Sequence, residues 1–214
     1  IELEPDNSEA HLYSSLAMLL NGEYEKGWEK YEWRNMQKGT VSTIHAVPNC
    51  KLWEGQPLKS ESKLLLVTEQ GLGDTLQFIR YALALKAQNL IIAICADARL
   101  HPLIKSSDLD PSPLSPKQAE QVREGLWIPL MSVPRRLDVS PSKPIINMPY
   151  IKSSTELTKK WKDILSKKSK PMIGINWRGN RNDTSRLSRN IPAHTFSKIT
   201  GALSGHFLYL QRDA

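Results

Sequence analysis

An apolar run that leads into a glycine-containing loop constrains the fold of this chain more than any other feature. Residues 64–67 read LLLV, and four consecutive apolar residues are typical of a buried strand in a parallel sheet. Gly71 and Gly73 then permit a tight turn, and apolar residues recur at helical spacing from 76 to 83. A strand, a glycine turn and a helix from Thr75 to about Lys86 are therefore predicted. Such a loop can either cradle an anion or aim a carboxylate.

Further apolar segments extend this pattern to an α/β fold. Residues 90–95, LIIAIC, suit a second buried strand, which is predicted to lie beside the first in a right-handed βαβ unit. Another strand is predicted at 126–130, followed by a loop at Met131–Pro134. The proline-rich stretch 108–116 is predicted as loop. Residues 172–177 form a later apolar run, which predicts the first strand of a second α/β domain.

The N-terminal part of the chain has the periodicity of helices. Apolar and aromatic residues recur at helical spacing over Ser8–Leu20 and from Tyr24 to about Trp33, on either side of the turn Asn21–Gly22. A helical hairpin is predicted, and its small and aromatic positions resemble those of a tetratricopeptide repeat, with Gly27 where alanine is usual. One repeat cannot bury both of its faces, so further repeats are expected before Ile1. An ordinary hairpin that covers a core is the alternative.

Composition and charge limit the classes of protein that fit. The chain has 214 residues, 40% of them hydrophobic, which is enough for a globular core. Its 29 Lys and Arg residues against 22 Asp and Glu residues give a net charge of +7, which favours anionic partners but is also compatible with solvated surface. Cys50 and Cys95 are too far apart for a metal or redox motif, the five histidines lack metal-ligand spacing, and no stretch is long enough for a membrane span. A cytoplasmic protein without a bound metal is expected.

Asp74 stands between the glycine turn and the predicted helix, and two roles fit it. As an N-cap it would accept hydrogen bonds from the first helical turn and stabilise the helix by about 1 kcal/mol. As a general base it would take a proton from a hydroxyl in a cleft. Glu69 and Gln70 are candidates either for hydrogen-bonding a polar acceptor or for fixing the loop. The two glycines alone are weak evidence for a nucleotide, because the third glycine of a dinucleotide fingerprint is missing.

A second polar loop, at 178–189, contains four arginines and is a candidate anion site. Guanidinium groups such as those of Arg178 and Arg189 bind phosphate oxygens through paired N–H donors, and Asn180 adds a neutral donor. A helix that starts near Pro192 would add the positive end of its dipole. An exposed basic loop without a ligand is the alternative.

The segment between the two α/β parts is predicted to contain an amphipathic helix. Leu157, Trp161 and Ile164 share its apolar face, and several lysines lie on the opposite face. The lysines either form an ordinary solvated surface or contact a membrane surface or an acidic partner.

Three motifs together carry a resemblance to a known family. They are EQGLGDTLQFIRY at 69–81, GEYEKGWEKYEWR at 22–34 and GINWRGN at 174–180. Over nearly its whole length the chain resembles bacterial tetratricopeptide-repeat proteins fused to a heptosyltransferase-like glycosyltransferase. The resemblance implies a GT-B architecture, in which two Rossmann-like domains face a cleft. The acceptor binds on the N-terminal side of that cleft and the nucleotide sugar mainly on the C-terminal side.

The resemblance implies five parts of the chain, the last of them cut short. They are a tetratricopeptide-like repeat at 1–37, a connector at 38–62, a Rossmann-like acceptor-side domain at 63–150, a linking helix at 151–170 and the truncated start of a nucleotide-sugar-binding Rossmann-like domain at 171–214. Because most of the donor domain would lie beyond Ala214, the isolated chain is expected to be inactive.

The implied reaction is inverting glycosyl transfer without a metal or other cofactor. Asp74 matches the family's proposed base, and the loop residues Glu69, Gln70, Gly71 and Gly73 would lie on the acceptor side. The family contacts the donor phosphates with a basic residue shortly before a helix-starting proline. Arg189 is the nearest match, although lysine is normal there, and Arg178 and Asn180 would assist it. Positive charge would then take the place of a metal.

The implied partners are a nucleotide sugar and a protein or glycan acceptor bound by the helical repeats. Peripheral contact with a membrane also fits the basic helix face, whereas nucleic-acid binding rests on charge alone and is not expected. The competing hypothesis is a non-catalytic interaction module whose α/β part is a degenerate sugar or nucleotide binder.

Overall fold

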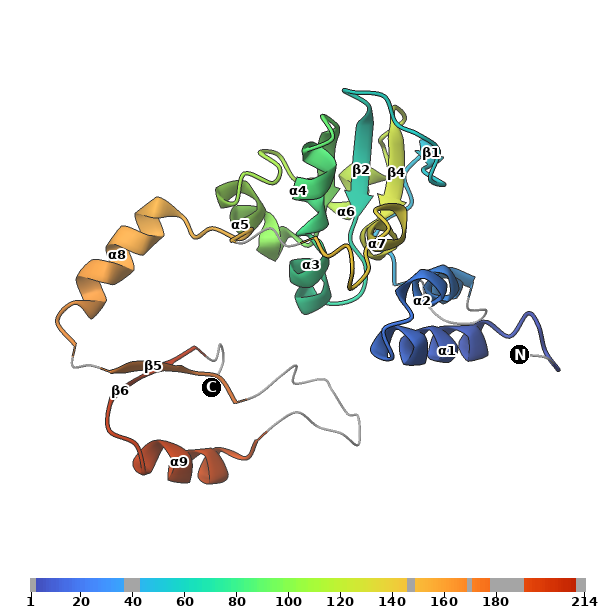
Figure 1. The fold of residues 1–214 in the computed structure, drawn as a ribbon. Helices are drawn as coiled ribbons and strands as arrows, with labels where there is room; N and C mark the ends of the chain where they lie inside the picture. Colours follow the sequence, from blue (N-terminus) through green and yellow to red (C-terminus); the bar gives the residue numbers. More distant parts are fainter. Residues whose placement is uncertain (1–2, 37–42, 146–148, 169–170, 178–190, 211–214) are drawn as a thin grey trace. The chain divides into compact units, whose positions relative to one another are not determined.

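The computed structural model describes residues 3–36, 43–145, 149–168, 171–177 and 191–210. The chain divides into two compact units, Ile1–Ser154 and Thr155–Ala214 (Figure 1). The first unit contains a helical hairpin and a four-stranded parallel sheet, and the second contains helices and a two-stranded parallel sheet. The predicted α/β class is confirmed.

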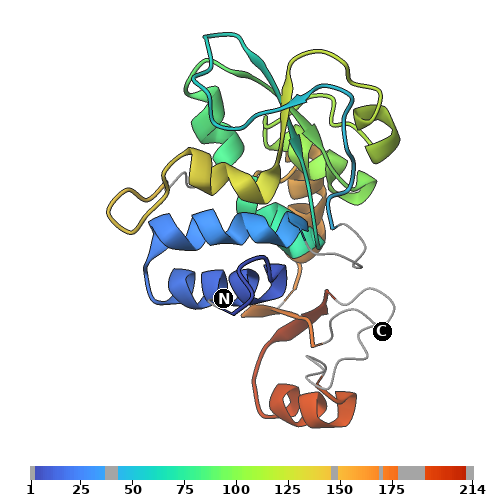
Figure 2. The same cartoon turned by 90° about the vertical axis from the view of Figure 1, so that its right-hand side faces the viewer.

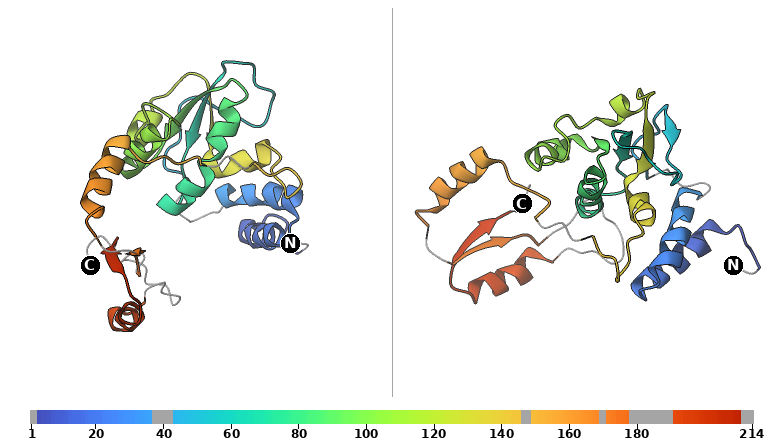
Figure 3. Two further views of the ribbon diagram at one scale, coloured as in Figure 1. Left: turned by 60° about the vertical axis from the view of Figure 1, so that its left-hand side comes forward. Right: turned by 45° about the horizontal axis from the view of Figure 1, so that its top comes forward.

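The N-terminal hairpin consists of α1 (Ser8–Leu20) and α2 (Tyr24–Tyr31), which continues as the 3-10 helix η1 (Glu32–Met36). The predicted hairpin is confirmed, and its two helices lie side by side in every view (Figure 3). Gly22 makes the turn with a φ of +86°. A Cβ at Gly27 would lie 2.8 Å from the side chain of Leu19, so glycine allows the close approach of α1 and α2 here.

The main sheet is formed by β1 (Lys51–Leu52), β2 (Lys63–Val67), β3 (Ile91–Cys95) and β4 (Leu126–Pro129). All pairs are parallel and the strand order is β1-β4-β2-β3, so β2 has β4 on one side and β3 on the other. The predicted strands at β2, β3 and β4 are confirmed. The sequence does not predict β1, because two exposed residues show no periodicity.

The helix predicted from Thr75 to about Lys86 is wrong in its extent. The structure has α3 (Leu72–Phe78) and α4 (Tyr81–Lys86), with a turn at 79–80 between them. The helix starts three residues earlier than predicted because Gly71 is its N-cap, which places Gly73 and Asp74 within the first helical turn.

The loop predicted at Met131–Pro134 is also wrong. The 3-10 helix η3 (Leu130–Ser132) leads directly into α7 (Val133–Arg136). Pro134 lies in the first turn of α7, where its missing N–H removes no intrahelical hydrogen bond. The remaining elements of the unit are η2 (Ala98–Leu100), α5 (His101–Ser106) and α6 (Pro116–Ala119).

Alternate residues of β2 point to opposite faces of the sheet. Leu64 and Leu66 belong to the larger core, together with Phe78, Leu85 and Tyr31 of the hairpin. Leu65 and Val67 belong to a smaller core that includes residues from segment 44–50 and α6. In the turned view, α2 lies between α1 and α7 (Figure 2). The hairpin therefore shares the hydrophobic core of the sheet.

The second unit consists of α8 (Thr155–Leu165), β5 (Met172–Ile175), α9 (Ala193–Gly201) and β6 (His206–Tyr209). Strands β5 and β6 pair in parallel, which confirms the strand predicted after residue 171. Helix α9 confirms the helix predicted near Pro192. Leu157, Trp161 and Ile164 of α8 are about half exposed.

Burial gives the two cysteines different reactivity. Both thiols are free, and Cys95 is completely buried at the end of β3, where burial raises its pKa to about 12. Burial also raises the pKa of the partly exposed Cys50. The thiolate is the reactive form, so Cys95 combines low access with a very small reactive fraction near neutral pH.

In the folded protein near neutral pH, we expect a maleimide reagent to label Cys50 about tenfold or more faster than Cys95, because Cys50 is more accessible and has the larger thiolate fraction. Mass spectrometry of the labelled protein measures this, with Cys50→Ser as the matched control. In denaturant both thiols should react at similar rates. Rapid labelling of Cys95 in folded protein would contradict its burial.

Candidate functional site

The carboxyl end of the main sheet contains a topological switch point. The chain leaves β2, returns in β3 on one side, and later returns in β4 on the other side. In open parallel sheets, ligands bind in the crevice outside the strand ends at such a point. Segment 68–71 leaves β2 here and η3 leaves β4 here, so these two segments form the candidate site.

The turn after β2 does not depend on its glycines, contrary to the sequence prediction. Gln70 has a φ of +58°, whereas Gly71 is extended and Gly73 lies in α3. A left-handed conformation is uncommon for a residue with a side chain and is kept only when its surroundings hold it. Here the Gln70 N–H donates to Thr43 O (2.9 Å), and the Gln70 carbonyl accepts from His45 Nε2 (3.0 Å).

Asp74 is half-buried and is not the N-cap. Its Oδ2 accepts a hydrogen bond from the N–H of Gly71, the residue that caps the helix, at 3.0 Å. Within the described part of the chain, Oδ1 accepts no hydrogen bond. The carboxylate thus stabilises the helix start from within its first turn, so the N-cap role predicted for Asp74 is wrong, and the role as a general base stays a prediction.

Glu69 is buried, and both of its carboxylate oxygens are engaged. Oε2 accepts from Arg34 Nε (2.9 Å), and Oε1 accepts from Arg34 Nη2 (2.9 Å) and from the Met131 N–H (3.0 Å). Its side chain is 0% exposed, so a substrate has no access to it. Of the two roles that the sequence leaves open for Glu69, fixing the loop is the one this geometry supports.

Arg34 is the partner that sequence analysis missed. It extends from η1 into the switch point, and all five N–H donors of its guanidinium group are hydrogen-bonded. Besides the two bonds to Glu69, Nη2 donates to Ser132 Oγ (2.8 Å) and Nη1 donates to Tyr31 O (3.0 Å) and Glu32 Oε1 (3.3 Å). Arg34 ends the motif at 22–34, but nothing in its spacing indicates a partner 35 residues away.

The surroundings of Arg34 favour the charged form of its guanidinium group. Burial by itself would lower the pKa of Arg34, but the hydrogen bonds and charge of Glu69, with Glu32 and Tyr31, outweigh burial and raise it. The pKa of Tyr31 is also raised, chiefly by burial, and the carboxylates of Glu69 and Asp74 add to this while Arg34 opposes it. Tyr31 is therefore a neutral hydroxyl that lies within electrostatic reach of Asp74.

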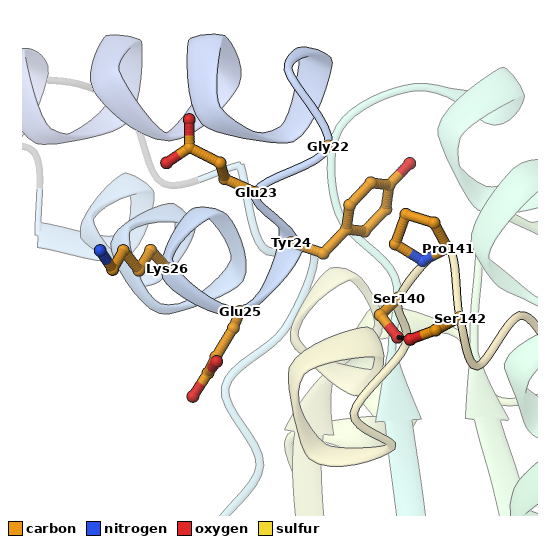
Figure 4. Close-up of a pocket in the computed structure, with 8 residues that line it drawn as sticks. All are labelled: Gly22, Glu23, Tyr24, Glu25, Lys26, Ser140, Pro141 and Ser142. Atoms are coloured by element: carbon orange, nitrogen blue, oxygen red, sulfur yellow. Dashed lines mark hydrogen bonds between the residues drawn. The ribbon is translucent and has the colours of Figure 1, made fainter.

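Two hollows lie beside the hairpin, and Asp74 lines neither of them. One, of about 350 Å³, is formed where the turn into α2 faces the loop after α7 (Figure 4). It is lined by Gly22, Glu23, Tyr24, Glu25, Lys26, Ser140, Pro141 and Ser142. A neighbouring hollow of about 320 Å³ shares Glu25 and is lined also by Trp28, whose Nε1 donates to Val139 O (3.0 Å). Both are open and of mixed charge.

The predicted donor-side residues Arg178, Asn180 and Arg189 lie outside the described residues. In the described ranges, no group of three or more His, Cys, Asp or Glu side chains could hold a metal ion. Among the helices that the structure describes, none has both the length and the apolar character needed to cross a membrane.

The fold and the site define an α/β protein whose switch-point loop is bound to a helical hairpin. No protein-family model, curated protein or solved structure matches the chain.

Proposed function

We propose that the chain forms the acceptor side of an inverting, metal-independent glycosyltransferase. The observation that carries the proposal is Asp74, a half-buried carboxylate at the switch point of a parallel sheet, one of whose oxygens accepts no hydrogen bond from the described residues. The EQGLGD motif that contains it supports the same reading. In this proposal α1 and α2 are a tetratricopeptide repeat, the main sheet belongs to the first Rossmann-like domain of a GT-B enzyme, and β5 begins the second.

The proposed chemistry needs one base and one anion-binding loop. Asp74 takes the proton from an acceptor hydroxyl while the hydroxyl oxygen attacks the anomeric carbon of the sugar. The bond to the nucleoside diphosphate breaks on the opposite face, which inverts the configuration. Arg178 and Arg189 supply positive charge to the departing diphosphate, with Asn180 as a neutral donor.

A second candidate function is a non-catalytic interaction module. The specific observation in its favour is that Arg34 and Glu69 occupy much of the switch point and leave neither charge for a ligand. On this reading, Asp74 serves only to stabilise the start of α3.

Asp74→Asn separates the two candidates because asparagine keeps an oxygen that accepts from the Gly71 N–H but has no basic carboxylate. In the full-length protein we expect transfer from a nucleotide-sugar panel to fall by roughly 10²–10⁴-fold. Calorimetry should find the donor affinity within about twofold of the unsubstituted protein, since Asp74 acts on the acceptor.

Asp138→Asn, at an exposed carboxylate, is the control and should leave transfer unchanged. Arg189→Ala should weaken donor binding instead. Full transfer by Asp74→Asn would exclude Asp74 as the base, and absence of binding to every nucleotide sugar would favour the interaction module.

A further inference from the structure

We infer that Arg34 is a positioning residue for the loop that carries Asp74, so the helical hairpin is an integral part of this site and not a separable module. The inference rests on the proposed function only for the chemical role of the loop, namely that it carries a catalytic Asp74. The positioning itself is carried by the contacts of Arg34 and can be tested without a substrate.

The first step is the place that Arg34 occupies. Its guanidinium lies between the segments that leave β2 and β4, where it contacts Glu69 on one side and Ser132 on the other. The Ser132 hydroxyl in turn donates to Glu32 Oε2 (2.9 Å), which returns the network to the hairpin. The ring of Tyr31 packs against the guanidinium, 4.5 Å from its central carbon. Only 4% of the Arg34 side chain is exposed.

The second step leads from Glu69 to Asp74. Glu69 is followed directly by the left-handed Gln70 and by Gly71, whose N–H donates to Asp74 Oδ2. On the other side, segment 43–45 holds the same loop: His45 N donates to Thr68 O (3.0 Å), and Thr43 O accepts from Gln70. The loop is therefore held between Arg34 and segment 43–45, and the unfavourable conformation of Gln70 needs both.

The third step distinguishes positioning from stability. A buried ion pair adds little net stability, because desolvation of two charges offsets their attraction, and apolar replacements of similar volume are often as stable. What the apolar pair cannot reproduce is the bidentate geometry that sets the direction of the Glu69 carboxylate. The bond from Met131 N–H to that carboxylate would also be lost, which removes one link between the segments that follow β2 and β4.

The experiment is hydrogen exchange of the backbone amides of Gln70, Gly71 and Thr75 in the full-length protein. The test variant is the double replacement Arg34→Met with Glu69→Met. The matched control is Lys63→Met with Glu124→Met, which removes an exposed ion pair (3.1 Å) from the same sheet with the same substitutions. The amides of β3 serve as the internal reference.

We expect the loop amides to exchange at least about tenfold faster in the test variant, with β3 amides unchanged, and no change in the control. If the Arg34–Glu69 pair only stabilised the fold, an apolar pair that restores stability would leave the loop amides as protected from exchange as in the unsubstituted protein. Unchanged loop exchange in the folded double variant would overturn the inference. If that variant does not fold, Arg34→Lys takes its place, because lysine keeps the positive charge but lacks the paired N–H donors of the guanidinium group. Unchanged exchange of the loop amides in Arg34→Lys would then overturn the inference.

The result is independent of the proposed function. Faster loop exchange without any glycosyl transfer by the unsubstituted protein leaves Arg34 as a positioning residue and rejects the transferase. Transfer activity that depends on Asp74, with unchanged loop exchange in the variants, rejects the role of Arg34 and keeps the transferase.

Discussion

Replacing Arg34 alone with methionine is expected to lower the free energy of unfolding by about 3–5 kcal/mol. The reason is that Glu69, with a side chain that is 0% exposed, would be left as a buried carboxylate that, among the described residues, keeps only the Met131 N–H as a donor. An unpaired buried charge is far less favourable than either a complete pair or an apolar pair. Urea unfolding followed by tryptophan fluorescence measures the change.

The double variant Arg34→Met with Glu69→Met is the comparison, and it should recover most of the stability lost in the single variant, because no buried charge is left unpaired. Lys63→Met, at the exposed ion pair with Glu124, should change the free energy of unfolding by less than about 1 kcal/mol. A single Arg34→Met variant as stable as the control would mean that Glu69 finds other partners or is not buried as described.

Shortening Ile94 to alanine is expected to lower the free energy of unfolding by about 2–5 kcal/mol. Ile94 is 0% exposed in β3 and lies in the core shared by the sheet and the hairpin, so removal of its methyl groups leaves a cavity. Ile91 of the same strand is 53% exposed and provides the matched control. Ile91→Ala should cost less than about 1 kcal/mol in the same unfolding measurement.

Equal losses of unfolding free energy in Ile94→Ala and Ile91→Ala would contradict the difference in burial between these two positions of β3. Thermal unfolding adds a further check, because a shared core predicts that Ile94→Ala lowers the melting temperature of the hairpin and of the sheet together. Separate transitions would show that the two parts unfold independently.

Local periodicity was sufficient for the regular elements whose residues are consecutive. Apolar runs predict strands β2, β3 and β4, and helical spacing predicts helix α1. Each of these elements depends on side chains that are close together in the sequence. The same reasoning placed Asp74 at a helix start. It failed on details decided by neighbours, such as the turn between α3 and α4, the helical course of Met131–Pro134, and the use of Gln70 in place of a glycine for the turn.

The tertiary structure alone decided which residues meet at the switch point. Arg34 bonds to Glu69 across 35 positions and to Ser132 across 98, and Met131 bonds to Glu69 across 62. No local pattern encodes these sequence separations, because they arise from the strand order, which brings the ends of β2 and β4 together. The sequence by itself determined that a strand and a glycine-containing loop deliver Asp74 to a helix start. Only the folded chain decided that an arginine from the hairpin holds that loop, since a buried charge can persist only where distant elements supply all of its partners.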